Sequence, residues 1–153
     1  MSEQPVIMPF EPVRRRRRAL AAVMRELEGV TATPLAGRAE AWSGAVADVL
    51  GHLDVVLAAH VEATERAGGL LASVREEEPA LDPLVRRLER EHVDLTRRTG
   101  EARAALGPAG SDEQRLADVR DRVTELLAEL ARHRQRGADL LYQAYQVDLG
   151  GGG

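Results

Sequence analysis

The sequence predicts an all-α fold, an antiparallel up-down bundle of four helices. Apolar residues recur three and four positions apart along four long segments, and no strand-like alternation of any length appears. The composition agrees, because Ala, Leu, Arg and Glu favour helix in a chain that is 44% hydrophobic and 30% charged. The length of 153 residues suits one domain with a real core. We expect an N-terminal arm over residues 1–12, the bundle over residues 13–148 and a flexible glycine tail over residues 149–153.

The first helix is predicted over residues 13–30, directly after Pro12. Its apolar positions fall three, four and three residues apart, which keeps them on one face. These positions are Leu20, Val23, Leu27 and Val30. Thr33 followed by Pro34 is the pair expected at the start of the next helix, because threonine caps a helix and proline fits its first turn.

The second helix is predicted from about Leu35 or Trp42 to Glu65. Its apolar stripe keeps the same helical spacing. The stripe consists of Trp42, Val46, Val49, Leu53, Val56, His60 and Ala63. Residues 70–78 are a candidate short helix before a linker that contains two prolines.

The third helix is predicted over residues 82–106, with Asp82 as its cap. Its stripe is Leu84, Leu88, His92, Leu95, Thr99, Ala102 and Leu106. The fourth helix starts with Ser111 and Gln114, which have the spacing of a capping box, and continues to about Val147. Its stripe is Leu116, Val119, Val123, Leu126, Leu130, His133, Gly137, Leu141 and Ala144.

Three histidines interrupt these apolar stripes, each on a different helix: His60, His92 and His133. A buried imidazole needs a partner, and inward histidines from separate helices commonly share a metal ion. His52 lies at the edge of its stripe, and Glu91 is the carboxylate that best borders one. We therefore predict that these five residues are the candidate ligands of a transition metal. At about 1.5 Å per residue the depths of the three stripe histidines differ by about two turns, so the spacing permits a site without demanding one.

The segments around these histidines resemble the hemerythrin-like (HHE cation-binding) family. They read HVEATE at residues 60–65, LEREH at residues 88–92 and ARH at residues 131–133. The resemblance implies a four-helix bundle with a non-haem di-iron centre that binds O2 or another small gas. It also implies a histidine on the first helix and carboxylates four or five residues after some of the later histidines.

The chain departs from that family pattern at the positions that complete a di-iron site. The first helix carries Arg16 or Arg17 at its inward position, and Thr64, Thr96 and Gly137 stand four residues after the three histidines. An arginine there would oppose a metal ion by charge repulsion. Two hypotheses stay open, a metal site that binds O2 or another small ligand, and a metal-free bundle that acts as a protein-interaction or homodimerisation module. Neither demands enzyme activity.

The residue types exclude several other classes of site. The chain has no cysteine, so neither a disulfide nor a thiolate metal site can form. All 21 basic residues are arginine, which rules out a lysine Schiff base and a P-loop lysine. The net charge of −4 argues against a nucleic-acid partner. The five arginines at positions 14–18 point around the whole helix, so we expect most of them to be solvated or paired with acidic residues.

The sequence also predicts where the protein resides. No run of about 18 apolar residues occurs, so we expect no membrane-spanning segment and no membrane partner. The apolar stretch near the N-terminus precedes its arginines, whereas a secretory signal has its charges first. We expect a cytoplasmic protein, and arginine in place of lysine, with abundant Ala and Gly, suggests a GC-rich bacterial genome.

Overall fold

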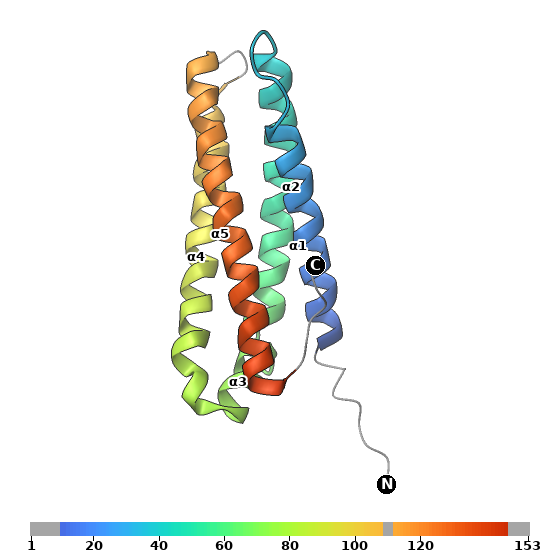
Figure 1. The fold of residues 1–153 in the computed structure, drawn as a ribbon, viewed down its shortest axis with the longest axis vertical. Helices are drawn as coiled ribbons and strands as arrows, with labels where there is room; N and C mark the ends of the chain where they lie inside the picture. Colours follow the sequence, from blue (N-terminus) through green and yellow to red (C-terminus); the bar gives the residue numbers. More distant parts are fainter. Residues whose placement is uncertain (1–9, 109–111, 147–153) are drawn as a thin grey trace.

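A computed structural model describes residues 10–108 and 112–146, and within these ranges the regular structure is helical, as predicted. Four long helices lie side by side along the longest axis of the molecule (Figure 1). They are α1 (Phe10–Thr31), α2 (Ala39–Glu65), α4 (Asp82–Leu106) and α5 (Glu113–Tyr145). The short helix α3 (Leu70–Glu77) and the 3-10 turn η1 (Pro79–Leu81) connect α2 to α4 at one end of the bundle.

The start of α2 differs from the prediction. Thr33 does not cap the second helix, because its hydroxyl donates to the carbonyl oxygen of Val30 at 2.6 Å and so closes the end of α1. The chain then turns through Gly37, whose φ of 73° suits glycine, and α2 begins at Ala39. The proline after Thr33 therefore lies in the connection and not in a first helical turn.

The starts of α4 and α5 also differ from the prediction. Asp82 is the first residue of α4 and makes no capping bond; its carboxylate accepts from the Nε of Arg75 at 2.6 Å. The cap of α5 is Asp112, whose Oδ1 accepts from the backbone N–H of Arg115 at 2.8 Å. The predicted cap Ser111 and the predicted glycine tail over residues 149–153 lie outside the described residues.

The predicted stripes supply most of the core, which forms two clusters. The larger cluster lies between the four long helices and includes Trp42, whose Nε1 donates to the carbonyl oxygen of Thr31 at 3.3 Å. The smaller cluster joins α3 to the adjoining ends of α1, α4 and α5 and consists of Val13, Leu70, Leu71, Val74, Val85, Leu88, Leu140 and Leu141. Along α4 and α5, His92 and His133 fall between residues of the larger cluster and residues of the smaller one.

One predicted core position on α4 is wrong. Leu84 is 37% exposed, whereas its neighbour Val85 is fully buried. Val85 lies seven residues before His92, close to two helical turns, and this places both residues on the inward face. Leu84 is shifted by about 100° around the helix axis from that position and therefore faces outward.

One helical stretch, Ala39–Glu77, is long and apolar enough by length and composition to cross a membrane. This differs from the expectation drawn from the sequence, because Ala, Val and Leu dominate α2 and its charged residues are widely spaced. The core helix of a bundle passes the same test, so the stretch assigns no location by itself. A cytoplasmic location stays a prediction.

Candidate metal centre

The three stripe histidines converge. His60 from α2, His92 from α4 and His133 from α5 are between 3% and 6% exposed. Their ring centroids are 4.8 Å apart for His92 and His133, 5.2 Å for His60 and His92, and 5.4 Å for His60 and His133. One ring nitrogen from each histidine lies within 4.8 Å of the other two, which makes the cluster a geometric candidate for holding a metal ion.

The three histidines converge although their depths from the helix ends still differ. Because α2 begins at Ala39, His60 lies about 31 Å along its helix, close to the depth of about 30 Å for His133 along α5. His92 lies only about 21 Å from the end of α4. Because the three rings converge, α4 ends about 9 Å short of the level at which α2 and α5 begin.

Two carboxylates hold the outer nitrogens of two of the histidines. The Nδ1 of His133 is 2.7 Å from Oε1 of Glu91, and the Nδ1 of His92 contacts Oε2 of Glu65. Because a carboxylate only accepts hydrogen bonds, both contacts favour the tautomer that carries its proton on Nδ1. The Nε2 of each ring then has a free lone pair, and this arrangement of carboxylate, histidine and inward Nε2 is typical of metal-binding histidines.

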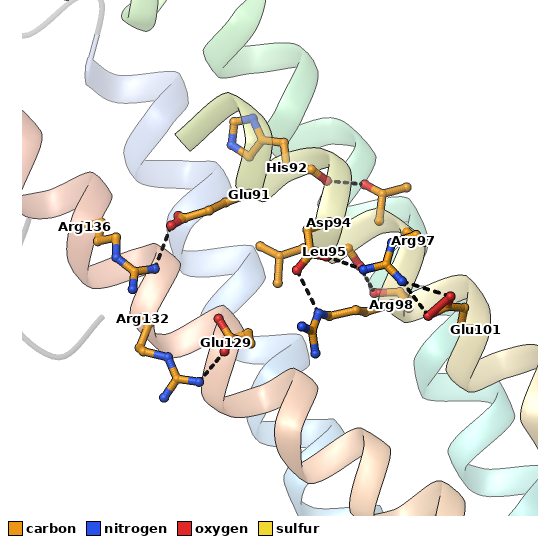
Figure 2. A network of polar contacts seen from close by, with 12 residues as sticks. Glu91, His92, Asp94, Leu95, Arg97, Arg98, Glu101, Glu129, Arg132 and Arg136 are labelled. Carbon is orange, nitrogen blue, oxygen red and sulfur yellow. Dashed lines mark hydrogen bonds and ion pairs between the residues drawn. The ribbon is translucent and has the colours of Figure 1, made fainter. Parts of the chain in front are cut away.

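Arginines on α4 and α5 hold the carboxylate of Glu91 in place. Arg136 donates through Nη1 to Oε2 of Glu91 at 2.7 Å (Figure 2), and the Nε of Arg87 lies 3.3 Å from the same oxygen. The carboxylate of Glu91 is therefore bound to Arg136 of α5 and to Arg87 in the preceding turn of its own helix. It supports His133 from outside the cluster and does not belong to the set of converging nitrogens.

His60 lacks such support. Its Nε2 faces the Nε2 of His133 at 3.3 Å, and its Nδ1 is buried without a hydrogen-bond partner among the described residues. Thr64 does not help, because its hydroxyl donates to the backbone carbonyl of His60 at 3.0 Å. One polar atom of the cluster is therefore left unsatisfied in the metal-free chain.

Burial keeps His60 and His133 neutral. Burial lowers the pKa of His60 well below its ordinary value, and the adjacent His92 and His133 lower it further. Burial, followed by the charges of His92 and Arg136, lowers the pKa of His133 to about 3. The contact between His133 and Glu91 is therefore a hydrogen bond from a neutral imidazole and not an ion pair. Neutral imidazole is also the form that binds a metal.

A cavity of about 30 Å³ adjoins the histidines. Its other walls are largely apolar, with Leu70, Leu71, Leu140 and Leu141 among them. A space of this size holds about two water molecules. The cavity therefore admits a small ligand next to the cluster and excludes a large one.

Two arginines also line this cavity, Arg17 from α1 and Arg134 from α5. The sequence predicted that Arg16 or Arg17 lies at the inward position of the first helix. Arg17 is the one that lines the cavity, and Arg16 is exposed. No ion pair joins Arg17 to an acidic residue of the described ranges; its Nη1 donates to the backbone carbonyl of Arg134 at 3.2 Å. Burial and the charge of Arg134 lower the pKa of Arg17 to about 10, so its guanidinium group stays charged near neutral pH. Burial, followed by the charge of Arg25, also lowers the pKa of Arg134.

The structure therefore brings together three of the five residues predicted as ligands. His52 lies on the surface, with its side chain 53% exposed and its Nδ1 3.4 Å from Oε2 of Glu26. Glu65, which is not among the five predicted ligands, contacts His92 across the boundary between α2 and α4. Helix spacing gives no signal for Glu65, because a residue five positions after His60 lies about 140° away around the helix axis.

The chain matches no protein-family model, no curated protein and no solved structure. The resemblance to hemerythrin-like domains therefore stays a prediction from the histidine pattern.

Proposed function

We propose that this protein binds one divalent transition-metal ion through the Nε2 atoms of His60, His92 and His133. One observation carries the proposal: buried imidazoles from three helices converge, and carboxylates hold the outer nitrogens of two of them.

The donor set favours a mononuclear site. Two irons need bridging carboxylates, whereas Glu65 and Glu91 are engaged with the outer nitrogens of the histidines. Three imidazole nitrogens suit iron, zinc or copper. A site with three protein ligands leaves a coordination position open for a small molecule, and the adjoining cavity accommodates one.

Iron as the metal and O2 as the ligand follow from the resemblance to the hemerythrin-like family and remain part of the proposal. The bundle supports this resemblance in its architecture, because successive long helices connect at alternating ends, as an antiparallel up-down order requires. It departs from the family in its first helix, where Arg17 stands in place of a histidine.

A metal-free interaction module is the second candidate function. Two isolated apolar side chains favour it, Val55 on α2 and Val93 on α4, which are 69% and 71% exposed. Single exposed apolar residues are ordinary on a protein surface, so contact with another protein or with a second copy of this chain would need a larger patch. They are single residues and not a continuous patch, so the histidine cluster is the stronger basis for a function.

Elemental analysis of untagged protein, purified without chelator, tests the metal site directly. We expect about one metal ion per chain, its loss in a His60→Ala, His92→Ala, His133→Ala triple variant, and its retention in His52→Ala. His52 is a matched control because it lies on α2 but is exposed and outside the cluster. Two irons per chain would replace the mononuclear site with a di-iron centre. A folded wild type that neither retains nor takes up metal would refute the proposal and leave the interaction module.

A further inference from the structure

We propose that the cavity beside the histidine cluster is a binding site for a small monovalent anion, held by the guanidinium groups of Arg17 and Arg134. The first observation is the charge of the cavity wall. Both arginines line it, and no aspartate or glutamate of residues 10–108 and 112–146 does. Positive charge beside a partly apolar cavity, without a counter-charge in its wall, attracts an anion.

The second observation is a set of unused hydrogen-bond donors. The Nε and Nη2 of Arg134 are buried and have no partner in the described part of the chain. Arg17 directs one nitrogen, Nη1, to a backbone carbonyl, which leaves its other N–H groups for a ligand. Buried guanidinium donors without acceptors are costly, and an anion supplies the acceptors that the protein does not.

The size and lining of the cavity set the class of anion. A volume of about 30 Å³ corresponds to about two water molecules, so an anion of about three heavy atoms fits. Leucines line much of the remaining wall, and the hydroxyl of Thr64 is directed to backbone carbonyls. These features suit a small, weakly hydrated monoanion such as formate or nitrite. They exclude bulkier anions such as phosphate monoesters or aromatic carboxylates.

The anion also completes the charge balance of the metal site, and this part of the inference rests on the proposed function. A dication on three neutral imidazoles would lie near two guanidinium groups, while Glu91 is already shared with Arg87 and Arg136. An anion at the open coordination position would lower that repulsion. Metal and anion should therefore strengthen each other's binding, and the coupling must be reciprocal.

The test is a titration with sodium formate, applied to chelator-treated protein and to protein loaded with Zn²⁺. Calorimetry gives the affinity, and the arginine Nε–H resonances of ¹⁵N-labelled protein locate the site. Gluconate holds the ionic strength constant because it is too large for the cavity, and benzoate serves as the size control. The variants are Arg17→Met and Arg134→Met, which keep a long apolar side chain. Arg132→Met is the matched control, because Arg132 also lies on α5 but is exposed and bonded to Glu129.

We expect saturable formate binding in the wild type, at least tenfold weaker in Arg17→Met and in Arg134→Met, unchanged in Arg132→Met, and tighter with Zn²⁺. Unchanged affinity in the two cavity variants would overturn the arginine site, even if formate then bound to zinc alone. Zinc binding without formate binding would refute the anion site and leave the metal site intact. Formate binding to a protein that takes up no metal would support the anion site and refute the metal site.

Discussion

Mild acid should destabilise the metal-free protein before its carboxylates become protonated. His60 and His133 are buried and neutral, because burial lowers the pKa of both, to about 3 for His133. In the unfolded chain both imidazoles regain an ordinary pKa of about 6.5. Below that pH the unfolded chain binds more protons than the folded chain, so the free energy of unfolding falls as the pH falls. The loss begins near pH 6.5 and continues down to the lowered folded-state pKa.

The size of the effect follows from the same shifts. Each histidine changes the free energy of unfolding by about 1.4 kcal/mol per pH unit within the window. Lowering the pH from about 7 to about 5 therefore removes about 2 kcal/mol for His133, and the lowered pKa of His60 adds a loss of the same sign. Domains are typically stable by roughly 5–15 kcal/mol, so the loss is large. Asp82 and Glu129, whose pKa values Arg75 and Arg132 lower, lose their charge only at more acidic pH.

Urea unfolding followed by circular dichroism, with a chelator present, measures this slope. A His60→Leu, His133→Leu double variant should be nearly insensitive to pH between about 7 and about 5. His52→Leu should retain the slope of the wild type, because His52 is exposed beside Glu26. A wild type whose stability does not change over this range would refute the description of these imidazoles as buried and neutral.

Three further predictions concern single residues. Glu91→Gln should weaken Zn²⁺ binding about 10–100-fold, because the outer hydrogen bond to His133 loses its charge. Glu101→Gln, on the exposed face of α4, should leave Zn²⁺ binding unchanged, and competition with a chromophoric chelator measures both affinities. Arg134→Met removes buried donors that have no partner among the described residues, so without added anion it should raise the free energy of unfolding by about 1 kcal/mol or more. A lower stability of this variant in urea unfolding would contradict the prediction. Val85→Ala should lower the free energy of unfolding by about 2 kcal/mol, and Leu84→Ala by less than about 1 kcal/mol, in the same assay. The predicted stripe, which contains Leu84 and not Val85, implies the opposite order.

The helices were predictable because one physical signal repeats along each of them. Spacings of three and four residues among Leu and Val predicted the long helices, and the observed core follows those stripes closely. The connections were less predictable. Thr33 has the identity of a helix cap, but a threonine hydroxyl donates equally well to the carbonyl of the preceding turn, and it does so to Val30.

The candidate site was predictable in its imidazoles and not in its carboxylates. A histidine on an apolar stripe must point inward, so His92 and His133 could be placed from spacing alone. Glu65 could not, because its role depends on how the end of α2 sits against α4, and helix spacing holds no information on that alignment. Glu91 was singled out for bordering its own stripe, but its partner is His133 on the neighbouring helix.

The layer of the core that contains His60, His92 and His133 is less stabilising than the apolar core beside it. The adjacent core is filled by Leu57, Leu95 and Leu130, none more than 1% exposed, and leucines in place of the histidines would continue it. The chain instead buries three imidazoles, and within residues 10–108 and 112–146 Nδ1 of His60 and two nitrogens of Arg134 have no hydrogen-bond partner. Each buried unpaired group costs about 1–3 kcal/mol. A ligand that binds only the folded chain and satisfies these groups stabilises it by mass action. The imidazoles and the arginines are therefore the basis for the two ligands that we propose, a metal ion for the former and an anion for the latter.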